Sequence, residues 1–355
     1  MNSINQVFWK GKRVFITGHT GFKGSWLSLW LQQLGAQVRG FALAAPTNPS
    51  IFELCSVASG MESEIADIRD LDLIKKSIAS FAPEILIHMA AQPLVRHSYL
   101  DPVETYQTNV LGTVNVLEAA RAVDDLKVII NITTDKCYQN NEWEWGYRES
   151  DPMGGDDPYS SSKGCAELVS AAYKKSFFDL AEMPKRIVTV RAGNVIGGGD
   201  WAKDRLIPDI LNAFEKSEPI RLRNPNAVRP WQHVLEPLSG YLMLAEQLWD
   251  ADINYFPAWN FGPHPDNIVS VGAIAESMSS QWGRGAKIEM DLGYHPHEAS
   301  ILKLDNSRAI SHLGWSPKLS LEHTLSLIIE WHKAHLDNVD IREVTLQQIK
   351  AFGAY

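Results

Sequence analysis

Tyr159 and Lys163 lie four residues apart at the start of a predicted helix, and together they are suited to moving a proton. Side chains at positions i and i+4 share one helical face, so the lysine ammonium can reach the tyrosine. A neighbouring positive charge favours the phenolate and lowers the pKa of the phenol. Such a pair also occurs by chance on solvated helices, so its meaning depends on the rest of the chain.

A second group of reactive side chains lies in the segment TTDKCY, at residues 133–138. Thr134, Asp135 and Lys136 follow an apolar run directly, where a predicted strand ends. An adjacent acid and base can give and take protons in one reaction, whereas the alternative is a simple strand-end turn. Open α/β sheets bind their ligands at the carboxyl ends of their strands, which favours the catalytic interpretation.

A glycine-rich turn, GHTGFKG at residues 18–24, follows the first predicted strand and opens a helix. Glycines permit a tight turn and a close approach to a pyrophosphate, and the helix N-terminus supplies amide donors. This context predicts dinucleotide binding rather than a plain structural turn. The expected contacts come from Gly18, His19, Gly21, Phe22, Lys23 and Gly24.

The second predicted strand, residues 37–43, ends without the acidic residue that normally binds an adenosine ribose. Arg39 lies nearby and an arginine can accommodate a 2′-phosphate, so NADP stays open beside NAD. Asp67, next to Ile68, is the candidate for receiving the adenine amino group. Its alternative role is to cap the helix predicted over residues 71–81, which Asp70 could do equally well.

The elements that must position these groups alternate along the first part of the chain. Predicted strands at residues 13–18, 37–43, 64–67, 85–90, 127–133 and 186–191 are interspersed with helices at residues 22–34, 71–81, 103–123 and 159–180. Parallel neighbours need crossover connections, so the expected fold class is α/β, with a doubly wound parallel sheet of the Rossmann type. We expect an NAD(P)-binding domain over residues 1–192. Residues 193–355 are expected to form mostly a smaller mixed α/β lobe, with some segments, such as strand 259–261, returning to the large domain.

Composition excludes several classes of function. A formal net charge of −9 argues against broad binding of nucleic acid or anionic membranes, so positive charge for an anionic ligand must be gathered locally. Cys55, Cys137 and Cys165 form neither a CxxC pair nor a metal-ligand spacing, which indicates a reducing compartment and no metal site. We find no apolar signal region and no long apolar run, so we expect a cytoplasmic protein.

In this order, the motifs resemble those of the extended short-chain dehydrogenase/reductases, and the resemblance covers nearly the whole chain. It is carried by TGHTGFKG, by HMAAQP at residues 88–93, by Asn109, by Thr133-Thr134 and by the Tyr159–Lys163 pair. Within that superfamily, TTDKCY and GHTGFKGSWL are most similar to nucleotide-sugar 4,6-dehydratases that act on CDP-glucose. The resemblance implies a homodimer held by a four-helix bundle of helices 103–123 and 159–180. It adds to the expected cofactor contacts Ala90, Ala91, Gln92, Asn109, Tyr159 and Lys163.

A dehydratase of this kind oxidises the sugar at C4, expels the C6 hydroxyl as water and then reduces C6. The resemblance implies that Tyr159 takes the C4 hydroxyl proton while Thr134 hydrogen-bonds that oxygen. Related dehydratases carry an Asp–Glu pair where this sequence has Asp135 and Lys136. Asp135 fits the general acid, and Lys136 is either the C5 base, as its position favours, or a cation that stabilises the oxyanion.

Substrate contacts are expected in the second part of the chain. Several arginines gather there in a short span, and arginine favours phosphate through its planar donor fork. A solvated basic face is an equal alternative for Arg221 and Arg223. His88, inside an apolar strand, is expected to be structural. The resemblance places the nucleotide sugar against Gln92, Asn194, Arg205, Arg229, Gln232, Asn260 and His297.

Other readings remain open at this point. A nucleotide-sugar 4-epimerase would need little beyond the tyrosine, the lysine and a threonine, and Asp135 and Lys136 speak against it. A dehydratase for another nucleotide stays open because nothing in the residues themselves selects cytosine. A non-catalytic NAD(P)-binding sensor is a remote alternative, since both Tyr159 and Lys163 are retained. The dehydratase reading implies a lyase in the synthesis of bacterial O-antigen 3,6-dideoxyhexoses.

Overall fold

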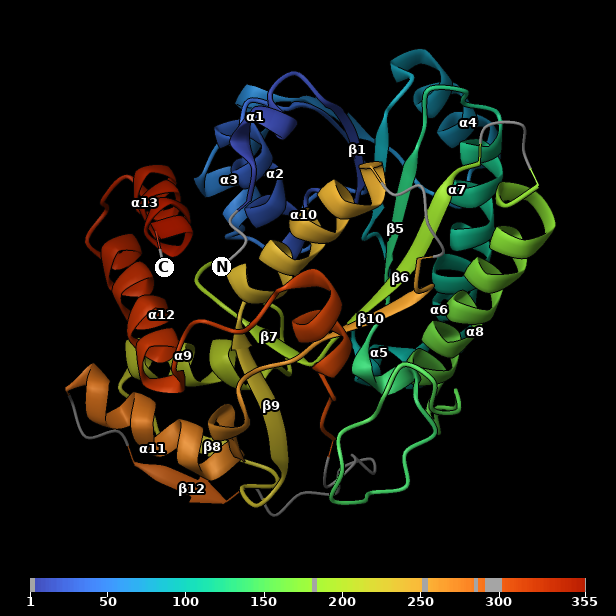
Figure 1. Cartoon of the computed structure of the whole chain (residues 1–355). Coiled ribbons are helices and arrows are strands. Elements are labelled where there is room, and N and C mark those ends of the chain that lie inside the picture. Colours follow the sequence, from blue (N-terminus) through green and yellow to red (C-terminus); the bar gives the residue numbers. More distant parts are fainter. Residues whose placement is uncertain (1–3, 181–183, 251–254, 284–286, 291–301, 355) are drawn as a thin grey trace.

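A seven-stranded parallel sheet organises the larger part of the molecule (Figure 1). The computed structural model describes residues 4–180, 184–250, 255–283, 287–290 and 302–354. The strands are β1 (Arg13–Thr17), β2 (Gln37–Ala42), β3 (Glu62–Ile65), β4 (Ile85–His88), β5 (Val128–Ile132), β6 (Arg186–Ala192) and β10 (Ala258–Phe261). Their order is β10-β6-β5-β4-β1-β2-β3, so the chain reverses its direction of travel between β1 and β4. The predicted doubly wound sheet is confirmed, and a ligand crevice is expected at this reversal.

Helices cover both faces of the sheet because successive strand residues point to opposite sides. Phe15 packs with α4 (Leu71–Phe81) and α7 (Gly112–Arg121), while Val14 and Ile16 pack with α2 (Phe22–Gln33) and α10 (Leu235–Asp250). In Figure 1, α8 (Pro158–Tyr173) lies beside α7. Two apolar clusters therefore lie on opposite faces of the sheet.

Two of the predicted helices contain π-helical turns. The helix expected over residues 103–123 is built from α6 (Pro102–Tyr106), a π turn (Gln107–Leu111) and α7. The helix expected over residues 159–180 is α8 followed by a π turn (Lys174–Phe178). A π turn contains one residue more than an α-helical turn, and such turns are frequent at functional sites.

A smaller lobe, at the lower left of Figure 1, is built from short strands and amphipathic helices. Its sheets are β11-β9-β7 and β12-β8. Its strands are β7 (Asn194–Ile196), β8 (Ile220–Leu222), β9 (Val228–His233), β11 (Ile268–Ser270) and β12 (Ile288–Met290), and its helices include α9 (Leu206–Lys216), α11 (Val271–Trp282) and α12 (Leu321–Leu336).

The chain passes between the two parts more than once. β10 pairs in parallel with β6, which confirms that strand 259–261 returns to the main sheet. The helix α13 (Ile341–Ala354) packs on α2 and α12, where the Phe352 and Trp30 rings meet edge to face. Among the described helices, none is long and apolar enough to cross a membrane.

Candidate active site

The end of β5 and the first turn of α8 face each other at the carboxyl edge of the sheet. Asp157 caps α8 by accepting a hydrogen bond from the Ser160 amide, and Pro158 occupies the first helical position. Tyr159 therefore lies in the first turn, buried toward the sheet. Opposite it, Thr134 begins a short 3₁₀ turn, and its hydroxyl accepts a hydrogen bond of 3.3 Å from the Lys136 amide.

The two helical residues predicted as a pair, Tyr159 and Lys163, are both buried. Lys163 Nζ donates to the carbonyl oxygen of Ile132 at 3.0 Å, and burial lowers the pKa of this lysine to about 8. Burial raises the pKa of Tyr159 to about 12, against the opposing effects of a hydrogen bond with Thr134 and the nearby charge of Arg205. Sequence reasoning assigned the acidifying charge to Lys163, whereas the cation that lowers the pKa of Tyr159 in the structure is Arg205.

Asp135 occupies a dry position beside these groups. Burial raises the pKa of its carboxyl, although Lys136, Thr134 and Arg229 act in the opposite direction. Thr134 Oγ1 donates to Oδ1 at 3.0 Å, while Oδ2 is buried without a partner among the described residues. A raised pKa is the direction that a general acid requires. Lys136 is only partly buried.

Gly193, between β6 and β7, gives Asp135 its space. A Cβ atom at this glycine would lie 2.5 Å from Pro230 Cγ and 3.2 Å from Asp135 Oδ2. Any larger residue would therefore displace the carboxyl or the proline. Sequence reasoning missed this glycine. The one signal for it in the sequence is its position just after the end of a predicted strand.

The glycine turn has the shape expected of a pyrophosphate cradle. Gly18 has a φ of +80°, and a Cβ there would approach the Ala90 amide nitrogen to 2.7 Å. A Cβ on Gly24 would lie 2.1 Å from the Gly18 carbonyl oxygen. By contrast, a Cβ on Gly21 would meet only that oxygen, at 3.5 Å, and no side chain caps the N-terminus of α2. The N-terminus of α2 is thus free of a side-chain cap, and such an end of a helix binds anions well.

Two other residues of this turn, His19 and Lys23, have distinct surroundings. His19 is buried against Gly40, its ring nitrogen Nε2 lies 2.7 Å from Ser63 Oγ, and burial lowers its pKa to about 4. Burial lowers the pKa of Lys23 to about 7, and the charges of Lys163 and Arg205 act in the same direction. Lys23 therefore reaches the catalytic groups, which sequence reasoning had not foreseen.

The structure shows the contacts of the charged residues near β2 and β3. The guanidinium of Arg39 donates to Glu62 and to Ser80 Oγ, and it stacks on the Phe81 ring at 4.8 Å. It is thus committed within the protein rather than free for a 2′-phosphate. Asp70 caps α4. Asp67 instead pairs with Arg69 at 2.6 Å.

Several expected binding residues form hydrogen bonds inside the protein. Asn109, in the first π turn, donates to Gln92 O and Ser162 Oγ and accepts from the Gln92 amide. It therefore ties α8 to the segment after β4. Ile68 is buried against Gly112, and Ala90 donates its amide to Thr17 Oγ1 at 3.1 Å.

The expected substrate contacts differ in how free their side chains are. Arg205 pairs with Asp200 and acts on Tyr159, and Arg229 is buried close enough to act on Asp135. Asn194 on β7 is partly exposed. Asn260 is fully buried. It accepts a hydrogen bond from Tyr138 Oη at 2.8 Å and donates one to Tyr147 O at 2.7 Å, so both ends of its amide are bonded within the protein.

Of the other candidates on this side, Gln232 donates to Phe261 O, while its side-chain oxygen has no partner among the described residues. His297 lies outside the described residues. Arg223 pairs with Asp204, and Arg221 is exposed on β8, as expected for a solvated face. His88 is bonded to Thr17 and Thr113, which confirms its structural role.

The charges that converge here suit an anionic ligand. Within an acidic chain, the side chains that act electrostatically on one another at this edge are mostly cationic. They are Lys23, Lys136, Lys163, Arg205 and Arg229, with Asp135 and Tyr159 among them. An acidic chain that binds an anionic ligand needs such a local excess of positive charge, as the sequence analysis predicted.

Comparison with known proteins shows the family of this chain and matches its fold. A family model described as GDP-mannose 4,6 dehydratase matches residues 15–328. CDP-glucose 4,6-dehydratase from Salmonella typhimurium is 54% identical over 352 residues, which cover 98% of each chain. A solved dTDP-glucose 4,6-dehydratase from Bacillus anthracis, in complex with NAD, has a TM-score of 0.77 at 20% identity and covers 94% of this chain and 100% of that one. UDP-glucose 4-epimerase from Thermus thermophilus also has a TM-score of 0.77, at 21% identity and with 90% and 99% coverage.

Proposed function

This chain belongs to the GDP-mannose 4,6-dehydratase family, and from that premise we propose that it is a CDP-glucose 4,6-dehydratase. It is an NAD-dependent hydro-lyase that converts CDP-glucose into CDP-4-keto-6-deoxyglucose and water. The observation that carries this function is the 54% identity, over 98% of the chain, to a relative of that name. Asp135 and Lys136, at the end of β5, support a dehydratase over an epimerase, because elimination of water needs an acid and a base that epimerisation does not.

The residues around the glycine turn fit the cofactor. Bound NAD supplies a two-electron oxidant for the C4 hydroxyl and later gives the electrons back to C6. Gly18, Gly21 and Gly24, with the open amides of α2, would hold its pyrophosphate. Asp67 would receive the adenine amino group, and Lys163 would hydrogen-bond the nicotinamide ribose. The engagement of Arg39 by Glu62 supports NAD over NADP.

Tyr159 takes the proton of the C4 hydroxyl in this proposal, and Thr134 hydrogen-bonds the same oxygen. A buried phenol with a pKa of about 12 is a poor base at neutral pH. We therefore expect cations to stabilise the phenolate during turnover; Arg205 already lowers this pKa, and Lys163, one helical turn away, is the second candidate. Once C4 carries a ketone, the C5 proton becomes acidic and the C6 hydroxyl can leave.

Asp135 and Lys136 then carry out the elimination of water in this proposal. Burial raises the pKa of the Asp135 carboxyl, and its Oδ2, which has no partner among the described residues, is the atom that would deliver a proton to the departing hydroxyl. Lys136 is the base for the C5 proton by its position, or else a cation that stabilises the enolate. Arg205, Arg229 and Asn194 are the proposed contacts for the diphosphate. The resemblance adds Gln92, Gln232 and His297, whereas Asn260 is buried and hydrogen-bonded within the protein.

A panel of nucleotide sugars tests the function directly. The purified protein with NAD is expected to convert CDP-glucose into a 4-keto-6-deoxy sugar, which is detected by its absorbance in alkali. dTDP-glucose, UDP-glucose and GDP-mannose are expected to react at least about 100-fold more slowly, because base specificity rests on groups that are left unpaired by the wrong base. Formation of the C4 epimer without loss of water, or no turnover of any sugar, would contradict the proposal.

We also infer the setting of the enzyme. Cys55, Cys137 and Cys165 are free thiols, which suits the reducing cytoplasm. Its 4-keto-6-deoxy product suits the synthesis of 3,6-dideoxyhexoses for O-antigen. A homodimer through α6, α7 and α8 is supported by exposed apolar side chains in and next to these helices, namely Leu100, Val103, Leu111, Leu168, Phe177 and Leu180.

A further inference from the structure

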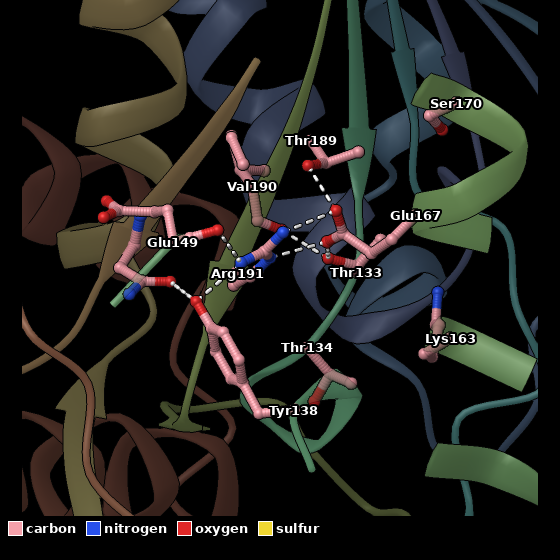
Figure 2. Close-up of polar contacts among 12 residues, drawn as sticks. Thr133, Thr134, Tyr138, Glu149, Lys163, Glu167, Ser170, Thr189, Val190 and Arg191 are labelled. Carbon is pink, nitrogen blue, oxygen red and sulfur yellow. Dashed lines mark hydrogen bonds and ion pairs between the residues drawn. The ribbon is translucent and has the colours of Figure 1, made fainter. Parts of the chain in front are cut away.

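A buried ion pair between Glu167 and Arg191 lies directly behind the catalytic residues (Figure 2). Glu167 is on α8, one turn beyond Lys163, and Arg191 is on β6. Arg191 donates from Nε and Nη2 to the two carboxylate oxygens, each at 2.8 Å. Both side chains are almost fully buried, with exposed fractions of 6% and 4%.

The Glu167 carboxylate is saturated by its neighbours. It also accepts hydrogen bonds from Thr133 Oγ1 at 2.5 Å and from Thr189 Oγ1 at 2.6 Å. Burial by itself would raise the pKa of Glu167, but Arg191 and these hydroxyls outweigh it and lower the pKa. The pair is therefore ionised, oriented and without conformational freedom.

Two arms of this network reach the ends of the catalytic turn. Thr133 immediately precedes Thr134 and binds Glu167. Tyr138, which follows Asp135-Lys136-Cys137, accepts from Arg191 Nη1 at 2.6 Å, and the guanidinium lies 4.8 Å from the centre of its ring. The turn at residues 134–137 is thus held at both ends by one ion pair, whose acidic member shares a helix with Tyr159 and Lys163.

Stability alone is a weak explanation for this arrangement. Replacing a buried ion pair by apolar residues of similar volume is often neutral or stabilising, because burial of two charges costs free energy. Such pairs are better suited to fixing one geometry. Here the geometry that is fixed is the register between β5, which ends at the acid and base, and α8, which carries the phenol.

We propose that Glu167 and Arg191 are positioning residues for dehydration: with Thr133 and Tyr138 they form a clamp that holds the turn at residues 134–137 in register with Tyr159 and Lys163. The inference rests on the proposed dehydratase function. The clamp residues bind the two ends of the turn, so they act through Thr134, Asp135 and Lys136. Displacing reacting groups by about 1 Å can cost roughly 100-fold in rate, so even a small loosening is measurable.

Three single-hydroxyl variants test the clamp without unpairing the buried charges. Thr133→Val and Tyr138→Phe each cut one arm. Thr189→Val is the matched control, because Thr189 binds the same carboxylate from β6 and makes no hydrogen bond to residues 134–137 in the described part of the chain. We expect the two arm variants to lower kcat about tenfold with KM for CDP-glucose changed less than about threefold. Thr189→Val is expected to keep kcat within about twofold of the wild type.

Hydrogen–deuterium exchange of the substrate-free protein gives a second measurement that does not depend on turnover. The amides of Lys136 and Cys137 are bonded within the turn to Thr134 Oγ1 and Thr134 O. Peptides covering these amides are expected to exchange about tenfold faster in both arm variants and at the wild-type rate in Thr189→Val. If all three variants behave alike in exchange, the clamp is wrong. If the wild type fails to turn over CDP-glucose while exchange follows the expected pattern, the proposed function fails and the clamp stands.

Discussion

At the scale of single residues, burial gives the Asp135 carboxyl its role. Its Oδ1 is bonded to Thr134 and its Oδ2 is enclosed without a partner, so the protonated form is favoured. General acids of this kind contribute about 10²- to 10⁴-fold to a rate. We therefore expect Asp135→Asn to lower kcat for dehydration at least about 100-fold, measured by formation of the keto sugar. A loss below tenfold would assign the leaving-group proton to another residue.

Gly193 makes the position of that carboxyl possible. In Gly193→Ala the new methyl group would overlap Pro230 and press on Asp135, so we expect kcat to fall about tenfold or more while NAD binding stays unchanged. Isothermal titration with NAD and the keto-sugar assay separate the two effects. Gly353→Ala on α13 is the control, since a Cβ there has nothing within 4 Å. Equal activity of the two variants would contradict the close contact.

At the scale of elements, α10 carries a buried acid remote from the active site. Burial raises the pKa of Glu236 to about 7, although its Oε1 accepts from the amides of Lys318 and Leu319. A group whose pKa is raised on folding stabilises the fold fully below its unfolded value, about 4.3 for glutamate. That contribution is lost as the pH rises through 7.

Glu236→Gln is accordingly expected to abolish part of the pH dependence of stability. Near pH 5 the variant and the wild type should unfold alike. At pH 8.5 the variant should be more stable by about 1–3 kcal/mol, as the shift in pKa implies. Thermal unfolding at the two pH values measures the difference, with the exposed Glu322→Gln on α12 as the control. A variant less stable than the wild type at pH 8.5 would show that the ionised carboxylate is favoured.

The main elements could be predicted because their patterns are long. Apolar runs and helical periodicity locate the sheet strands and α4, whose bounds match the prediction. β7, β8, β11 and β12 are three residues each, too short for a period of two to be visible. The π turns lie inside segments that were predicted as continuous helices, and their residue types do not mark them in the sequence.

Site residues could be predicted where a motif fixes them locally. The glycine turn, the Tyr159–Lys163 spacing and the segment after β5 are all of this kind. The contacts of Lys23, Gly193 and Arg191 depend instead on segments far apart in sequence. The one available signal for the ion pair was Glu167, four residues after Lys163 on the same helical face.

At the scale of the whole molecule, the exposed apolar side chains in and next to α6 and α8 predict self-association. Leu168, on α8, is 62% exposed. We expect the wild type to be a dimer by multi-angle light scattering and Leu168→Asp to shift it to monomers, because a carboxylate cannot be buried unpaired at an apolar interface. Leu336→Asp, at an exposed position on α12, should leave the dimer intact. Dimers in both variants would place the interface elsewhere.

The return of β10 to the main sheet has a consequence for synthesis on the ribosome. Within the described sheet, β10 is the edge strand and covers the outer side of β6. A nascent chain makes β6 first and must then make most of the smaller lobe before β10 emerges. During that interval the outer edge of β6 is an unpaired row of amides and carbonyls, open to pairing with a neighbouring nascent chain. Slow translation between the two strands is therefore when this protein is most prone to aggregate.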